Sequence, residues 1–290
     1  MSGSRVDTIP TLPKRLQDSH KGLYGTVLVV AGSRGMSGAA ALCGAASLRS
    51  GAGLARIICP LEIQPTVASY EPSYMTYPVA NDPDGLLQFE AAKSAITRFI
   101  EHSNVLAIGP GLGQSDDVTK LVLWILESLD IPVVLDADGL NALIGFPEAI
   151  RSRKGPLVIT PHPGEFARLT GKSTATVQAN RVAMAIELAN SSEPLVVVLK
   201  GAGTIVTDGS RVYKNETGNP GMSTGGVGDV LTGMIAALIG QKLPPFEAAQ
   251  LGSYVHGLAG DIARDQNGEV GMIAGDMIDS LPDAFFHLPS

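Results

Sequence analysis

The sequence predicts an α/β fold with a mostly parallel central sheet that is covered by helices on both faces. Short runs of continuous apolar residues recur at 26–32, 54–60, 104–110, 132–138, 157–163 and 195–201, and polar or glycine-rich turns follow them. Apolar runs that do not alternate with polar residues predict strands with both faces buried. Helical patterns fill the gaps between the runs. This alternation indicates βαβ units with right-handed crossovers.

The helices are predicted in the same order along the chain. Small residues at 38–51 predict a helix that packs closely on the sheet, and further helical patterns cover 117–129, 176–190 and 246–265. Residues 203–209 and 211–215 are expected to form a short antiparallel pair joined by a tight turn. No linker, repeat or charge block interrupts the sequence. We therefore expect one domain over residues 1–290, with residues 1–20 extended or weakly ordered.

The composition excludes several classes of partner and location. With 44% hydrophobic residues and 17% charged residues, the chain can bury a large core. Its net charge of −7 argues against nucleic acid or an anionic membrane as a main partner, since both require a basic face. The two cysteines, Cys43 and Cys59, lie in apolar stretches and are expected to be buried free thiols in a reducing cytosol. Residues 1–20 lack the apolar core of a secretory signal. A cytoplasmic location is expected.

The most informative segment is residues 215–233, NETGNPGMSTGGVGDVLTG, which leads into an apolar helix. Glycine permits positive φ and close backbone approach, so a glycine-dense loop at a helix start can direct several free N–H groups at one anion. The carboxylate of Asp229 lies where a phosphate would dock, which is unfavourable unless the carboxylate removes a proton from a hydroxyl. The alternative is an N-capping aspartate after a flexible loop.

Other turns are candidate ligand contacts because open α/β sheets bind ligands beyond the carboxyl ends of their strands. Lys200 follows an apolar run directly and either reaches solvent or meets a phosphate. Asp136 and Asp138 either cap the next helix or hold Mg²⁺ through water. His162, between two prolines, is expected to face a ligand, with a core histidine as the alternative.

Other common motifs are weak or absent. Glycines at 32, 35 and 38 do not match G-x-G-x-x-G, and no His/Cys cluster has the spacing of a zinc site. The sequence also lacks the G-x-S-x-G of a serine hydrolase. The chemistry is therefore expected to centre on a phosphate-bearing ligand.

Six segments resemble, in order, the motifs of the ADP/ATP-dependent NAD(P)H-hydrate dehydratases, a family of the ribokinase-like superfamily. They are HKGLYGTVLVVAGSRGMSGAAAL, AIGPGLG, PVVLDADGLNAL, TPHPGEFARL, VVLKGAGTIV and GNPGMSTGGVGDVLTG. The similarity spans about residues 22–281. The first motif begins about twenty residues into the chain, so we expect the single-domain form without the epimerase domain that some members carry.

The resemblance implies a set of site residues. Asp229 would be the catalytic base that activates the acceptor hydroxyl. The nucleotide (ADP/AMP) would contact Lys200, Gly201, Ala202, Gly203, Thr204, Asn219, Gly221, Gly225, Gly226 and Gly228. The hydrated dinucleotide would contact Ala40, Gly113, His162, Glu165 and Asp229.

The resemblance also implies the reaction. The 6-hydroxyl of (6S)-NADHX or NADPHX would be phosphorylated by ADP, or ATP, with Mg²⁺, and phosphate would then be eliminated to restore NADH or NADPH. The bacterial-looking single-domain form favours ADP. A homo-oligomer, a tetramer in the family, and functional coupling to a separate epimerase are further expectations. Two alternatives remain: a ribokinase-like kinase of the hydroxymethylpyrimidine or hydroxyethylthiazole type, and a non-catalytic nucleotide-sensing protein.

Overall fold

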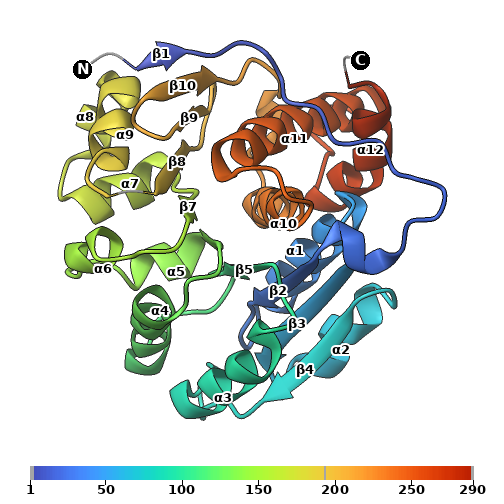
Figure 1. The fold of residues 1–290 in the computed structure, drawn as a ribbon, viewed down its shortest axis with the longest axis vertical. Coiled ribbons are helices and arrows are strands. Elements are labelled where there is room, and N and C mark those ends of the chain that lie inside the picture. Colours follow the sequence, from blue (N-terminus) through green and yellow to red (C-terminus); the bar gives the residue numbers. More distant parts are fainter. Residues whose placement is uncertain (1–2, 193, 289–290) are drawn as a thin grey trace.

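The computed structural model describes residues 3–192 and 194–288 and consists of one ten-stranded sheet between two layers of helices (Figure 1). The strand order is β1-β10-β9-β8-β7-β6-β5-β2-β3-β4. The strands are β1 (Ser4–Arg5), β2 (Thr26–Val30), β3 (Leu54–Pro60), β4 (Met75–Val79), β5 (Val105–Ile108), β6 (Val133–Leu135), β7 (Leu157–Ile159), β8 (Leu195–Leu199), β9 (Ile205–Thr207) and β10 (Arg211–Lys214).

The direction of the strands brings the predicted ligand turns to one edge of the sheet. β9 pairs antiparallel with both β8 and β10, and the other strand pairs of the described chain are parallel. β10 therefore runs in the same direction as β8. The segments that follow β2, β5, β6, β7, β8 and β10 all begin at the same carboxyl edge, which confirms the predicted parallel α/β arrangement.

One helical layer packs against each face of the sheet. The first layer contains α1 (Ser37–Arg49), α2 (Gln64–Tyr70), α10 (Val227–Gly240), α11 (Pro245–Asn267) and α12 (Ala274–Phe286). The second contains α3 (Phe89–Ile100), α4 (Asp116–Ser128), α5 (Ala137–Asn141), α6 (Pro147–Arg151), α7 (Pro163–Thr170), α8 (Thr174–Ala179) and α9 (Arg181–Ala189). The 3₁₀ turns η1 (Lys21–Tyr24) and η2 (Pro220–Met222) complete the secondary structure of the described residues.

The central strand β2 shows why the apolar runs are continuous. Its residues Val27 and Val29 belong to the core on the α1 and α10 side, whereas Leu28 and Val30 belong to the core on the α4 side. Successive strand residues point to opposite faces, so a strand covered on both sides needs an apolar side chain at every position.

Several predicted elements differ from the observed ones. The helix expected over 176–190 is divided into α8 and α9 at Asn180, whose backbone leaves the helical conformation (φ −134°, ψ 33°). The strands expected over 132–138 and 157–163 end early, at Leu135 and Ile159, because α5 and α7 begin within the predicted ranges. The edge strand β4 was not predicted, and its Pro78 weakens the strand signal.

From residue 3 on, the N-terminal segment is anchored to the sheet and to α11. β1 pairs with β10, and the amide of Gln250 in α11 donates a 2.8 Å hydrogen bond to the Thr8 carbonyl oxygen. Both cysteines are buried free thiols, which confirms the prediction. Among the described helices none has the length and apolar character needed to cross a membrane.

The contact between α1 and α10 depends on a glycine. A Cβ atom at Gly233 would overlap the carbonyl oxygen of Cys43, so a side chain at this position would push α10 away from α1. We expect Gly233→Ala to lower the free energy of unfolding by about 1–3 kcal/mol, measured by denaturant titration.

Gly240 in the same helix is the matched control. A Cβ atom there would make only ordinary contacts, the nearest at 3.7 Å from Val105 Cγ1. Gly240→Ala should therefore be neutral or stabilise the protein by up to about 1 kcal/mol through helix propensity. Equal effects of the two substitutions would contradict the close-packing argument.

Candidate active site

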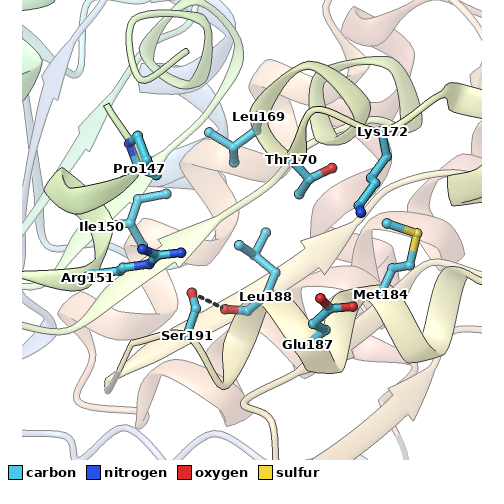
Figure 2. A pocket seen from close by; sticks show the side chains of 10 residues that line it. All are labelled: Pro147, Ile150, Arg151, Leu169, Thr170, Lys172, Met184, Glu187, Leu188 and Ser191. Atoms are coloured by element: carbon cyan, nitrogen blue, oxygen red, sulfur yellow. Dashed lines mark hydrogen bonds between the residues drawn. The ribbon is translucent and has the colours of Figure 1, made fainter. Parts of the chain in front are cut away.

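The smaller of two hollows in the described structure contains none of the predicted site residues. It has a volume of about 250 Å³ and lies between α6, α7 and α9 (Figure 2). Its apolar floor, with Ile150 and Leu188, is bordered by Arg151, Lys172 and Glu187. It is separate from the turns at the carboxyl edge of the sheet and is not the candidate site.

The larger cavity, about 830 Å³, lies at the carboxyl edge. Its walls come from the end of β7, the turn between β8 and β9, the loop between β10 and α10, and one face of α11. Eight of the predicted residues line it, namely His162, Lys200, Gly201, Ala202, Gly203, Thr204, Asn219 and Gly228. This volume is in the range of roughly 300–1,000 Å³ that is typical of small-molecule sites.

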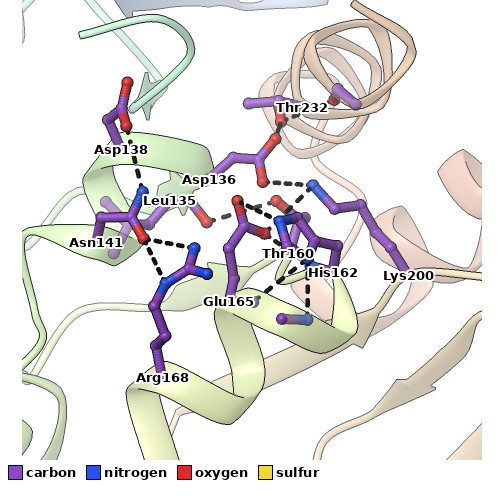
Figure 3. Close-up of polar contacts among 12 residues, drawn as sticks. Leu135, Asp136, Asp138, Asn141, Thr160, His162, Glu165, Arg168, Lys200 and Thr232 are labelled. Atoms are coloured by element: carbon purple, nitrogen blue, oxygen red, sulfur yellow. Dashed lines mark hydrogen bonds and ion pairs between the residues drawn. The ribbon is translucent and has the colours of Figure 1, made fainter. Parts of the chain in front are cut away.

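A buried ion pair joins three elements beneath this cavity (Figure 3). The ammonium group of Lys200, at the end of β8, lies 2.7 Å from Oδ1 of Asp136, at the end of β6. The hydroxyl of Thr232 in α10 donates to the other oxygen, Oδ2, at 2.7 Å. Asp136 is 1% exposed and Lys200 is 18% exposed. Lys200 therefore has an intramolecular partner, which the sequence analysis did not anticipate.

Three carboxylates surround this single ammonium. Burial alone would lower the pKa of Lys200, but Asp136 and Glu165 outweigh it and raise that pKa above its ordinary value. Asp229, in the first turn of α10, has a pKa raised to about 7 by burial and by the negative charge of Asp136, although Lys200 opposes the shift. A carboxylate with a pKa near neutrality is suited to act as a general base.

The turn from Lys200 to Gly203 is held by Arg181, the first residue of α9. Its guanidinium donates to the carbonyl oxygens of Leu199, Lys200 and Gly203 at 3.0–3.3 Å. The amide groups of residues 201–203 have no acceptor within the described chain. Because most carbonyl groups of the turn are occupied and these amide groups have no acceptor, the turn presents donors to an anion.

The glycine loop is anchored to α11 and leads to an uncapped helix start. Asp261 accepts hydrogen bonds from the amide of Gly218 (2.9 Å) and the side chain of Asn219 (3.1 Å). Gly226 adopts φ 88° immediately before α10, and no side chain caps the helix. The amide groups of residues 224–229 have no acceptor in the described chain. This end of α10 therefore has the free donors that bind phosphate.

His162 caps α7 and also faces the cavity. Its Nδ1 accepts hydrogen bonds from the amides of Gly164 (3.0 Å) and Glu165 (3.3 Å), and Glu165 in turn accepts from the His162 amide at 2.7 Å. Its side chain is 51% exposed. His162 is therefore not a core histidine, and it has a structural role that the sequence analysis did not consider.

The remaining predicted residues do not line the cavity. Ala40 is fully buried, and Gly113 (φ 71°) donates its amide proton to Asp138 at 2.9 Å. A Cβ atom at Gly225 would meet no atom within 4 Å. The others are Gly221, Gly226, Glu165 and Asp229. Glu165 and Asp229 lie behind the cavity wall and interact electrostatically with Lys200, which lines it. The assigned contacts of these residues stay predictions.

The carboxylates do not form a dedicated metal cage. No group of three or more His, Cys, Asp or Glu side chains within the described ranges is arranged to hold a metal ion. Asp136 accepts from Lys200 and Thr232, and Asp138 accepts from Gly113 and Asn141. These carboxylates could contact Mg²⁺ through water, while nucleotide phosphates supply the direct ligands, as is common for Mg²⁺.

Two cavity residues on α11, Ser253 and His256, were not predicted from the sequence. Both lie inside a regular helical pattern, far from any strand end, so no local signal distinguished them from core residues. Only the packing of α11 against the loop between β10 and α10 brings them to the site.

The buried ion pair leads to a test of Lys200. We expect Lys200→Met to lower the free energy of unfolding by on the order of 3 kcal/mol, because the buried carboxylate of Asp136 loses its counter-ion. Adding Asp136→Asn should restore most of the loss. Thermal and denaturant unfolding of the two single variants and the double variant would measure the coupling. A double variant as unstable as the sum of the singles would contradict the pairing.

Comparison with known proteins identifies the family of the chain. The profile of the NAD(P)H-hydrate dehydratase family matches residues 27–283. A bifunctional NAD(P)H-hydrate repair enzyme of Moorella thermoacetica is 46% identical over 273 residues, which cover 93% of this chain and 51% of that protein. An ADP-dependent (S)-NAD(P)H-hydrate dehydratase of Neisseria meningitidis is 39% identical, covering 91% and 86% respectively. The chain thus spans about half the length of the bifunctional relatives.

Solved structures agree as well. The ADP/ATP-dependent NAD(P)H-hydrate dehydratase of Bacillus subtilis, co-crystallised with ATP and Mg²⁺, is 34% identical with a TM-score of 0.81, covering 95% of this chain and 94% of that one. An Arabidopsis ribokinase, 13% identical with a TM-score of 0.57 and covering 90% and 98%, shares the fold alone. The ribokinase-like fold class is confirmed, and the chain belongs to the NAD(P)H-hydrate dehydratase family.

Proposed function

We propose that this protein is a carbon–oxygen lyase that dehydrates (6S)-NADHX or NADPHX to NADH or NADPH with ADP, or ATP, as cosubstrate. The observation that carries the proposal is Asp229. Its carboxylate has a pKa of about 7 at the uncapped start of α10, beside a cavity bordered by free amide groups. A base next to a phosphate-binding helix end is the arrangement that phosphorylation of a hydroxyl requires.

The reaction follows from these groups in two steps. Asp229 takes the proton of the 6-hydroxyl group while the oxygen of that hydroxyl attacks the terminal phosphorus of ADP, and AMP leaves. The C6–O bond then breaks as the lone pair of the ring nitrogen expels phosphate, and loss of a C5 proton restores the dihydropyridine. Lys200 and the amide groups of the two glycine-containing turns would stabilise negative charge on the transferred group.

The cosubstrate and metal rest on the same groups. Phosphates close to Asp136, Glu165 and Asp229 would be repelled, since Lys200 offsets only one of the three carboxylates. Mg²⁺ on the phosphates would offset the remaining charge. Support comes from the Bacillus subtilis relative, which was co-crystallised with ATP and Mg²⁺, and from the Neisseria relative, which is named as ADP-dependent.

A coupled assay tests the proposal. Purified protein would be incubated with NADHX, Mg²⁺ and either ADP or ATP, and the regenerated dihydropyridine would be followed by its near-ultraviolet absorbance together with released orthophosphate. We expect both products in equal amounts. A stable phosphoester in place of orthophosphate would identify a ribokinase-like kinase, and nucleotide binding without turnover would identify a nucleotide-sensing protein.

Further expectations concern partners. Functional coupling to a separate NAD(P)HX epimerase is supported by the bifunctional relatives, of whose length this chain matches about half. A homo-oligomer, with a tetramer as the family resemblance implies, and a cytoplasmic location stay predictions. Sedimentation of the purified chain would determine its oligomeric state.

The role of Asp229 predicts two effects of Asp229→Asn. Loss of the base should lower kcat by roughly 10²–10⁴-fold while ADP binding, measured calorimetrically, persists. In the wild type, kcat/KM should rise with pH through an apparent pKa near 7, because the free enzyme must lose the Asp229 proton before it can act as base. An Asn variant with more than half of wild-type kcat would disprove the assignment.

The same pKa predicts a pH-dependent stability difference. Folding raises the pKa of Asp229, so the folded state binds this proton more tightly than the unfolded state. The contribution of this proton to the free energy of unfolding is fully present below the ordinary carboxyl pKa and is lost as pH rises through about 7. Asparagine does not titrate, so the Asp229→Asn variant does not show this decrease in stability with pH. Its melting temperature should therefore exceed that of the wild type more at pH 8 than at pH 4. A pH-independent difference would argue against the raised pKa.

His162 can be tested with a matched pair of variants. His162→Ala removes the cap of α7 and should cost about 1 kcal/mol of stability, whereas His162→Asn retains a good capping residue. If His162 contacts the hydrated dinucleotide, both variants should raise KM for NADHX roughly tenfold to a hundredfold with the ADP dissociation constant unchanged. An unchanged KM in both would make His162 a helix cap only.

A further inference from the structure

His256 of α11 is a buried histidine that lines the large cavity. It is 8% exposed, and its Nε2 lies 2.9 Å from the carbonyl oxygen of Val227, the first residue of α10. Ser253 precedes it by three residues in the same helix, lines the same cavity, and has a buried hydroxyl without a hydrogen-bond partner in the described chain. Residues three apart lie on the same face of a helix, so two polar groups mark one wall of the cavity.

The contact with Val227 determines the tautomer of His256. A carbonyl oxygen only accepts hydrogen bonds, so Nε2 must carry the proton. Burial lowers the pKa of His256 to about 4, against the opposing effect of this hydrogen bond, and the ring stays neutral at physiological pH. A neutral imidazole has one N–H, which leaves a lone pair on Nδ1. No donor in the described part of the chain reaches Nδ1.

The free lone pair on Nδ1 of His256 favours those parts of a nucleotide that can donate a hydrogen bond. Ionised phosphate oxygens have no proton to donate and would be repelled by the Nδ1 lone pair. The phosphates are instead expected at the free amides of the glycine loop and near Lys200, where donors converge. The donors of a nucleoside diphosphate are its ribose hydroxyl groups and the exocyclic amine of adenine. The nucleoside half therefore matches the α11 wall.

We propose that His256 is a specificity-determining residue for the nucleoside half of the cosubstrate, whose O–H or N–H donor is accepted by Nδ1. The inference rests on the proposed function for the identity of the ligand. It extends that function because it assigns the recognition of the nucleoside to α11, separate from the turns that bind phosphate. Val227 links the two, since the same imidazole also contacts the first residue of α10.

Two substitutions separate ligand recognition from support of α10. In His256→Gln, the amide nitrogen can reach the Val227 carbonyl as Nε2 does, but no acceptor remains at the position of Nδ1. In His256→Asn, the shorter side chain can place its oxygen near that position but loses the donor to Val227. The Gln variant therefore tests the ligand contact, and the Asn variant tests the structural contact.

The experiment is calorimetric titration of the full chain with Mg²⁺ and four nucleotides: ADP, 2′-deoxy-ADP, 3′-deoxy-ADP and inosine diphosphate. We expect His256→Gln to bind ADP about tenfold more weakly than the wild type, and His256→Asn, which keeps an acceptor near the position of Nδ1, to lose less affinity than the Gln variant. For the one analogue that lacks the donor read by Nδ1, the Gln variant and the wild type should bind equally. A deoxy analogue would identify a ribose hydroxyl, and inosine diphosphate the amine.

Unchanged ADP affinity in the Gln variant, or an equal loss for all four nucleotides, would overturn the inference. Nitrogen NMR of the wild-type imidazole provides a test without substitution: Nδ1 should be unprotonated and its resonance should shift when ADP is added, and a protonated or unresponsive Nδ1 would also overturn it. None of these measurements requires NADHX. A wild type that binds ADP as expected but does not dehydrate NADHX would contradict the proposed function alone.

Discussion

The ion pair between Lys200 and Asp136 is the interaction on which the geometry of the candidate site depends. It joins the ends of β8 and β6, and Thr232 connects it to α10, which carries Asp229. A buried charge without a partner is costly, so the three elements cannot separate without losing the pairing. A Cβ atom at Gly228, in the first turn of α10, would lie 3.3 Å from Lys200 Nζ, so a side chain there would crowd the ion pair.

This arrangement places more negative than positive charge where phosphate is expected. Burial, followed by the negative charge of Asp136, raises the pKa of Asp229 to about 7, and the same burial makes the site unfavourable for an uncompensated anion. In the proposed function, the site would therefore need a cation brought by the nucleotide. One cluster of carboxylates would then link proton transfer to the charge of the cosubstrate.

Much of the fold could be predicted because strands buried on both faces read as continuous apolar runs, as β8 and residues 27–30 of β2 do. The candidate phosphate site was also predictable, since glycines and one aspartate are adjacent in sequence before α10. The break between α8 and α9 was not, because Asn180 leaves the helical conformation there although no glycine or proline marks the position. His256 was not predictable either, because a histidine inside an amphipathic helix has no local signal that separates a ligand contact from a core position.

Arg181 also explains how an acidic protein can bind phosphate with few cations. The chain carries a net charge of −7, so binding cannot rely on a broad positive surface. By taking up carbonyl oxygens of the turn after β8, the guanidinium leaves the amide groups of residues 201–203 as the exposed polar groups of that turn. The uncapped start of α10 presents amide groups from the other side. In the proposed function, backbone donors, which do not titrate, would recognise the anion, and the titratable carboxylate of Asp229 would remain free for proton transfer.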